Sequence, residues 1–175
     1  MTSLVYGQDH DVVGWVMSRI PYINMEDIDY YSFTGIGLEE DGEYIAGCLY
    51  SNHTGHDVHM HFATASSKCA TKRNFRAWFY YPFVQLGCKR VTALVAKPNK
   101  RSRKFIERAG FKLEGTARKG FDGIKDACIY GMLFEECRYI KTARDRMQED
   151  GRKRRRITTT STRSSGSRGG AGGNK

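Results

Sequence analysis

Two hydrophobic periods alternate along the first 65 residues. Residues 8–20 place apolar side chains at helical spacing, with acidic residues at their start and Pro21 after their end, so we expect a short amphipathic helix. Residues 32–65 instead form three β-rich runs separated by the short turn sequences EDGE and NHTGHD. This second pattern predicts an antiparallel meander of three strands.

The helical period returns between Thr71 and Leu86, where aromatic side chains fall on one face. Gly87 follows at a position where glycine favours the end of a helix. Pro82 lies inside this pattern and has no backbone N–H to donate, so we expect a kink near Trp78.

The next part of the pattern predicts a strand, a helix and a hairpin. Residues 88–96 form a compact β-rich run that suits a buried strand, and Asn99 can cap a helix over residues 100–109 that ends at Gly110. A final hairpin is predicted from two further β-rich runs, residues 111–120 and 124–137. This order of elements predicts an α/β or α+β fold with helices on the faces of a sheet.

Charge is distributed unevenly over the 175 residues, whose formal net charge is +10. Residues 151–175 hold eight Lys and Arg and no acid, and few apolar residues, so we expect a domain over residues 1–145 and a basic, disordered tail over residues 146–175. Residues 1–60 carry ten acids and one base, whereas residues 68–119 carry fifteen bases and two acids. The basic half favours a polyanionic ligand.

Composition excludes several classes of protein. The five cysteines are scattered and never spaced C-x-x-C, which argues against a disulfide scaffold or a zinc module, so we expect no metal site and a reducing, cytoplasmic location. No apolar run approaches the roughly 20 residues that a bilayer span needs, and the N-terminal residues lack a secretory signal pattern. We therefore expect no membrane association.

The starts of two predicted helices are the candidate anion-binding sites in the sequence. Lys72 and Arg73 lie in the first turn of one predicted helix, and the helix after Asn99 also begins with basic residues. Cations at a helix N-terminus oppose the macrodipole, and a bound anion would offset this cost. The alternatives are a solvated basic face at both sites and, at the second, a surface for nucleic acid.

The residues from Asn99 onward resemble a known superfamily. The pattern N-x-x-S-x-x-x-x-E-x-x-G-F, followed by K-L-E-G and by D-x-x-x-Y-G-M-L, resembles the GCN5-related N-acetyltransferase (GNAT) superfamily, and more narrowly its short ribosomal-protein-alanine-acetyltransferase-like members from bacteria and tailed phages. The similarity covers roughly residues 10–140. It implies a mixed, mostly antiparallel central sheet with helices on both faces, and direct transfer of acetyl from acetyl-CoA to a primary amine in a ternary complex. It also suggests a bacteriophage origin, with the host cytoplasm or a virion as the location.

The resemblance also implies which residues bind acetyl-CoA. The pyrophosphate cradle matches residues 69–74, with the main-chain amides of Ala70, Thr71, Lys72 and Arg73 as donors. Further contacts with the pantetheine arm and the diphosphate match Phe62, Ala63, Asn99, Ser102 and Phe105. The sequence departs from the family in one respect, because its loop, residues 67–73, contains none of the usual glycines.

Catalysis of this kind needs a group that takes a proton from the attacking ammonium. Strand alternation places Asp57, His59 and His61 on one face, and we predict His61 as the base, with Asp57 or His59 assisting through water. The family often has a tyrosine acid where this chain has Phe105, so Tyr130 is the substitute candidate. The alternative interpretation is that these side chains only pack or form hydrogen bonds.

Three functions remain open at this point. The first is an acetyl-CoA-dependent N-acetyltransferase whose acceptor is a protein or a small molecule. The second is a catalytically weak or inactive GNAT-fold protein that serves as a binding, virion or host-interaction component. The third adds weak nucleic-acid contact through the basic residues 152–175.

Overall fold

The computed structural model describes residues 1–20 and 33–140. Its strands are β1 (Thr2–Val5), β2 (Thr34–Glu40), β3 (Glu43–Ser51), β4 (Asp57–Thr64), β5 (Arg90–Ala96), β6 (Lys112–Ala117) and β7 (Ala127–Leu133). Its helices are α1 (Asp9–Met17), α2 (Lys72–Tyr80) and α3 (Lys100–Ala109), with a π-helical turn η3 (Tyr81–Gln85) and the short 3₁₀ turns η2 (Ser67–Cys69) and η4 (Phe134–Glu136). The predicted tail and its boundary at residue 145 lie outside the described residues. No helix in the described ranges is long and apolar enough to span a bilayer.

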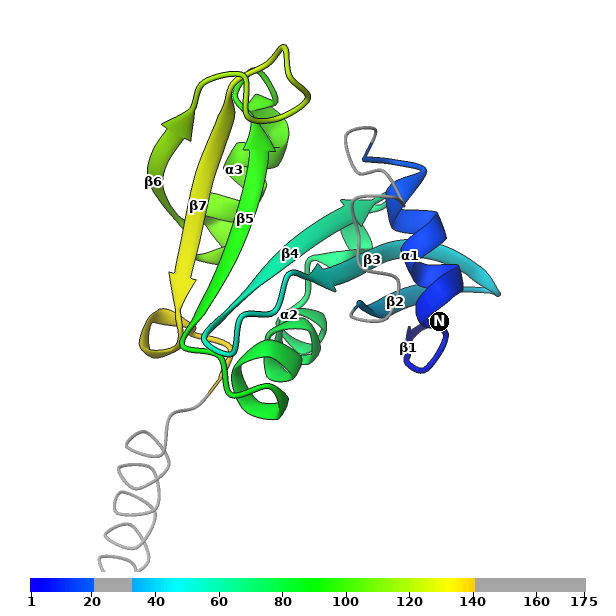
Figure 1. Cartoon of the computed structure of the whole chain (residues 1–175). Coiled ribbons are helices and arrows are strands. Elements are labelled where there is room, and N and C mark those ends of the chain that lie inside the picture. The colour runs from blue at the N-terminus through cyan, green and yellow to red at the C-terminus, as the bar shows by residue number, and fades with distance from the viewer. Residues whose placement is uncertain (21–32, 141–175) are drawn as a thin grey trace, which may run out of the picture. The chain divides into compact units, whose positions relative to one another are not determined.

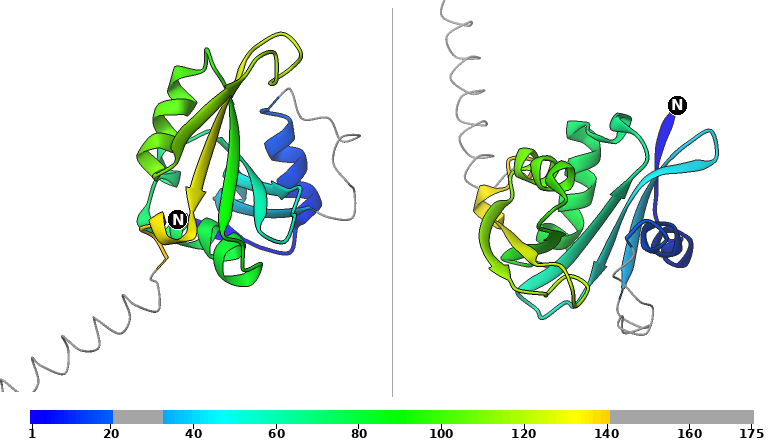
Figure 2. Two further views of the ribbon diagram at one scale, coloured as in Figure 1. Left: turned by 60° about the vertical axis from the view of Figure 1, so that its left-hand side comes forward. Right: turned by 90° about the horizontal axis from the view of Figure 1, so that it is seen from above.

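The seven strands form one sheet in the order β1-β2-β3-β4-β5-β7-β6. All neighbours are antiparallel except β4 and β5, which are parallel. Helix α1 covers one face, and α2 and α3 lie on the other (Figure 1 and Figure 2). The predicted fold class, a mixed and mostly antiparallel sheet with helices on both faces, is therefore confirmed.

The two parallel strands separate soon after they meet. β4 and β5 pair over only three positions, from Asp57 opposite Arg90 to His59 opposite Thr92. Beyond that point the remaining residues of the two strands diverge, which opens the sheet (Figure 1). Backbone groups on the facing edges of the divergent parts have no ladder partner across the gap, so they are available to a ligand.

Helix α1 packs closely on β3 because glycine occupies the contact. A Cβ atom at Gly47 would lie 2.8 Å from Cγ2 of Val16 and 3.3 Å from Cγ1 of Val12, closer than side chains normally pack. Both valines are buried in a small cluster that includes Leu49 of β3 and Ala63 of β4. The helix therefore lies directly on β3 and on the divergent end of β4, which borders the opening.

Pro82 shapes the end of α2. The predicted kink takes the form of the π-helical turn η3, in which the Leu86 amide donates to the carbonyl of Tyr81 at 3.0 Å. Proline has no N–H for the carbonyl four residues earlier, which belongs to Trp78. The buried hydroxyl of Tyr50, on β3, donates to that carbonyl at 2.6 Å, so the missing helical hydrogen bond is replaced from the sheet.

Both ends of α3 match the sequence prediction. The side chain of Asn99 accepts a hydrogen bond from the Ser102 amide at 3.0 Å, and Gly110 adopts a left-handed conformation with φ of 115°. One strand was not predicted. β1 is only four residues long and pairs with β2 at the edge of the sheet, and so short a run carries little periodicity.

Candidate functional site

The start of α2 and the middle of α3 meet beside the opening between β4 and β5. Phe75 is in the first turn of α2, and its ring centroid lies 5.9 Å from that of Phe105 in α3. Phe62, on the divergent part of β4, stacks on Phe105 with centroids 5.0 Å apart and planes inclined by 10°. Strand β4 and both helices thus converge at one place. The Phe62–Phe105 stack also fills part of the space beside the opening, so a ligand that follows β4 must contact this pair.

A groove of about 570 Å³ runs between α2 and α3. Its lining residues are Ala70, Lys72, Phe75, Phe105, Arg108, Ala109, Arg138 and Tyr139. Three of these carry positive charge and none is acidic, while the aromatic rings supply an apolar wall. The groove therefore suits an elongated ligand that has both an apolar part and anionic groups.

The loop before α2 turns two of the four predicted amide donors inward. The amides of Ala70 and Thr71 donate to the carbonyl oxygens of Ser67 at 3.1 Å and Cys69 at 2.8 Å. The prediction that both amides face a ligand is therefore wrong. Without glycine, the loop closes on itself as a 3₁₀ turn and satisfies its own backbone.

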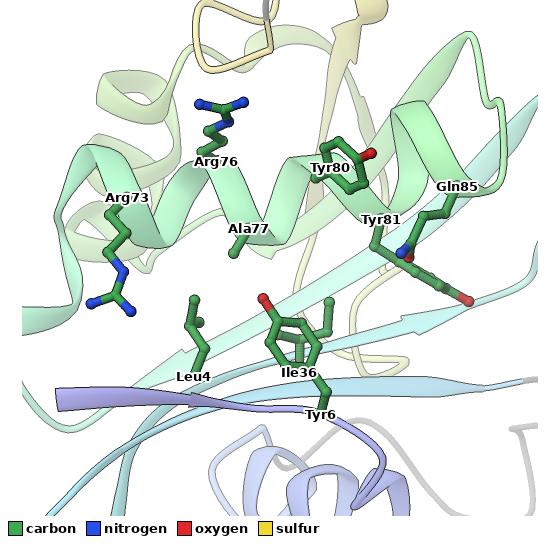
Figure 3. Close-up of a pocket in the computed structure, with 9 residues that line it drawn as sticks. All are labelled: Leu4, Tyr6, Ile36, Arg73, Arg76, Ala77, Tyr80, Tyr81 and Gln85. Carbon is green, nitrogen blue, oxygen red and sulfur yellow. The ribbon is translucent and has the colours of Figure 1, made fainter.

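The other two predicted amides begin α2. Thr71 caps the helix, its hydroxyl accepting from the Asn74 amide at 3.2 Å. Within the described residues, the amides of Lys72 and Arg73 have no hydrogen-bond partner. Their side chains diverge: Lys72 lines the groove beside α3, whereas Arg73 lines a separate cavity next to β1 (Figure 3). The structure thus brings Lys72, but not the Arg73 guanidinium, to the predicted cofactor groove.

The remaining predicted cofactor residues border the opening or the start of α3. Phe62 faces the helices α2 and α3, and Ala63 faces α1, so the main chain between them runs along the divergent edge of β4. Asn99 uses its side-chain oxygen to cap α3, and Ser102 is half-buried in the first turn. Phe62 stacks on Phe105, whereas Asn99 and Ser102 lie at the first turn of α3, and the contacts of all these residues with a cofactor stay a prediction.

His61 lies on the α1 face of β4, at the start of the opening. Its Nε2 lies 3.0 Å from Oγ of Ser51. Burial, with a smaller contribution from the neighbouring His59, lowers the pKa of His61 to about 4. The imidazole is therefore neutral near neutral pH.

His59 lies at the last paired position of β4, with its ring centroid 6.4 Å from that of His61. Its Nε2 lies 3.4 Å from Nδ2 of Asn52. Burial lowers the pKa of His59, whereas the Asp57 carboxylate acts to raise it and Arg90 to lower it. The two histidines thus lie on the same face of β4. Asp57 and Arg90 affect the pKa of His59, whereas burial dominates the pKa of His61.

A polar network that sequence reasoning missed joins the paired ends of β4 and β5. The Thr92 hydroxyl donates to Oδ2 of Asp57 at 2.6 Å, and Arg90 forms an ion pair with the same carboxylate at 3.4 Å. Arg90 also binds both carboxylate oxygens of Glu114 on β6, across the intervening strand β7 at Gly131. These partners are far apart in sequence, so only the strand order could have revealed them.

Tyr130 lies on the opposite face of the sheet from His61. Its buried hydroxyl donates to Oε1 of Glu107 at 2.7 Å and accepts from Nε of Arg103 at 3.0 Å. Burial is the main cause that raises the pKa of Tyr130. The structure does not bring the predicted acid and base together, and it gives Tyr130 contacts that tie α3 to β7.

Comparisons with known proteins point to one fold. No protein-family model matches the sequence, and no curated protein is a significant match. Among solved structures, a probable acetyltransferase matches with 27% identity and a TM-score of 0.53, over 61% of this chain and 64% of that one. Mutant forms of the spermidine/spermine N-acetyltransferase SpeG from Vibrio cholerae match with 14% identity and a TM-score of 0.60, over 77% of this chain and 96% of that one.

A further SpeG mutant from Vibrio cholerae matches with 14% identity and a TM-score of 0.61, over 80% of this chain and 96% of that one. The chain therefore has the fold of these acetyltransferases.

Proposed function

We propose that the chain is an acetyl-CoA-dependent N-acetyltransferase that acts on a primary amine by direct attack in a ternary complex. The observation that carries this proposal is the opening between β4 and β5, with a cationic groove on one face and a pair of histidines on the other. The names of the structural neighbours support acyl transfer to an amine. Acetyl-CoA supplies the acetyl group as an activated thioester.

The described residues fit acetyl-CoA on the α2–α3 side. The unpaired amides of Lys72 and Arg73 at the start of α2, together with the Lys72, Arg108 and Arg138 side chains of the groove, suit its phosphates. The divergent edge at Phe62 and Ala63 offers backbone groups for the amide-bearing arm. Asn99, Ser102 and Phe105 border the same region.

The acceptor amine then approaches from the α1 face, where the histidines lie. A base whose pKa is about 4 holds a proton weakly: moving a proton to His61 from a lysine-like ammonium of pKa about 10.4 costs about 1.4 kcal/mol per pKa unit, or about 9 kcal/mol. His61 is therefore better suited to orient the amine as a neutral ring. His59, next to the Asp57 carboxylate, is the better proton acceptor and passes the proton to solvent.

Thiol release from acetyl-CoA in the presence of spermidine, lysine and a peptide with a free N-terminus tests the proposal. We expect turnover with at least one of these amines, and we expect Lys72→Gln to raise the KM for acetyl-CoA about tenfold through the loss of a charge-assisted contact. Lys104→Gln is the matched control, because Lys104 is an exposed cation of α3 that does not line the groove. Absence of calorimetric binding at millimolar acetyl-CoA contradicts the proposal.

The second candidate is a GNAT-fold protein that binds a ligand without turning it over, as a virion or host-interaction component. Two observations favour it: the glycine-free loop that uses two of its own amides, and the stack of Phe62 on Phe105 beside the opening. Acetyl-CoA binding without thiol release across the amine panel supports this candidate. Nucleic-acid contact through residues 152–175, a cytoplasmic location and a phage origin stay predictions from the sequence.

A further inference from the structure

A second cavity lies on the other side of α2 from the cofactor groove. It occupies about 410 Å³ between α2 with its π-helical turn and the edge strands β1 and β2 (Figure 3). Its volume is within the range of small-molecule sites. Consecutive residues separate the two cavities: Lys72 lines the cofactor groove, and Arg73 lines this one. The proposed acetyl transfer makes no use of this second space.

One end of the cavity is cationic. Arg73 and Arg76 lie three residues apart on α2, and Figure 3 shows the Arg73 guanidinium directed toward β1 and the Arg76 guanidinium directed away from the strands. In the part of the chain that the structure describes, neither arginine has a carboxylate partner, and no acidic residue lines the cavity. Two like charges at this spacing repel, and Arg73, in the first turn, also opposes the dipole of the helix that begins at Lys72. An anion held between them removes both costs.

The rest of the cavity is apolar and aromatic. Leu4 and the buried Ile36 form its floor on β1 and β2, and Tyr6 and Tyr80 stand at its edges. The side chains of Tyr6 and Tyr80 are 58% and 43% exposed, although large aromatic residues usually bury most of their surface. A flat ring placed against them covers this exposed aromatic surface while its anionic group reaches the arginines.

We propose that this cavity binds a small aromatic anion, an aryl phosphate or an aryl carboxylate. The charged group binds the Arg73 guanidinium, the exposed Arg76 side chain turns toward it from the direction seen in Figure 3, and the ring lies against Tyr6 over the Leu4 floor with Tyr80 at the edge. Guanidinium groups suit both anions because they offer paired donors in one plane. The aromatic wall distinguishes such a ligand from a simple inorganic anion.

Titration of the ¹⁵N-labelled full chain with phenyl phosphate, benzoate and inorganic phosphate tests the proposal by NMR. We expect phenyl phosphate or benzoate to shift the backbone amides of Leu4, Tyr6 and Ala77 in a saturable manner, and the tighter of the two identifies the anionic group. Inorganic phosphate should bind at least tenfold more weakly than the better aryl ligand. Equal binding of inorganic phosphate indicates an adventitious ion only and overturns the proposal.

Two variants locate the site. Arg76→Gln should weaken binding about tenfold, because it removes a charge-assisted contact. Arg118→Gln removes the same charge from an exposed residue that lines neither cavity, and it should change the affinity by less than twofold. Unchanged affinity in Arg76→Gln, or shifts confined to Ala70 and Ala109 of the cofactor groove, would overturn the proposal. These outcomes do not depend on whether the chain transfers acetyl groups.

Discussion

The buried imidazole of His61 links the stability of the fold to pH. Its pKa is about 4 in the folded chain, against 6.5 for an unperturbed histidine. Between these values the unfolded chain binds a proton that the folded chain does not bind, so stability falls as the pH falls. The neutral His61 ring makes its full contribution to the free energy of unfolding above about pH 6.5. Relative to that, the free energy of unfolding falls by about 2 kcal/mol at pH 5 and about 3 kcal/mol at pH 4.

Urea unfolding of the native chain and of His61→Gln at pH 7 and pH 5 measures this contribution. Glutamine keeps a polar partner for Ser51 but does not titrate, so the native chain should lose about 2 kcal/mol more than the variant over this interval. His53→Gln replaces an exposed histidine and should show the native pH dependence. Equal losses in the native chain and in His61→Gln, or NMR titration of the His61 ring near pH 6.5, would refute the reasoning from burial.

Three further substitutions test the packing that positions the site. Gly47→Ala should lower the free energy of unfolding by about 1–3 kcal/mol, because its methyl group would press α1 away from β3; Gly115→Ala, with open space around it, should stay within about 0.5 kcal/mol of the native chain in the same urea titration. Tyr50→Phe leaves the Trp78 carbonyl without its donor and should cost about 1–3 kcal/mol, and an unchanged urea midpoint would show that water replaces the hydroxyl. Asn99→Ala removes the cap of α3 and should cost about 1 kcal/mol, seen as a Tm lower by several degrees; a native Tm would contradict the role of the cap.

Local signals in the sequence account for much of the fold. The cap at Asn99 and the glycine at position 110 define α3 because each acts within one helical turn. The proline at position 82 predicts a disturbance near Trp78 because it removes one specific donor. Alternation along β4 correctly separates His59 and His61 from Phe62, since the period of two is a property of the strand itself.

The features that remained unpredicted depend on distant parts of the chain. Arg90 meets Glu114 only because β6 lies one strand beyond β7. The inward turn of the Ala70 amide depends on how a loop without glycine closes, which residue types alone do not determine. The divergence of Lys72 and Arg73 into two cavities depends on β1, a strand too short to give a periodic signal.

The hydrogen bond from the Tyr50 hydroxyl to the backbone of α2 affects how the end of that helix unwinds. A helix normally frays from its last turn inward, since its final carbonyl groups have no hydrogen-bond partner within the helix. Here one of those carbonyl groups is anchored from within the sheet, so unwinding must also break a bond that crosses the hydrophobic interior. The far end of α2, the helix that lines both cavities, is therefore held in place by the sheet.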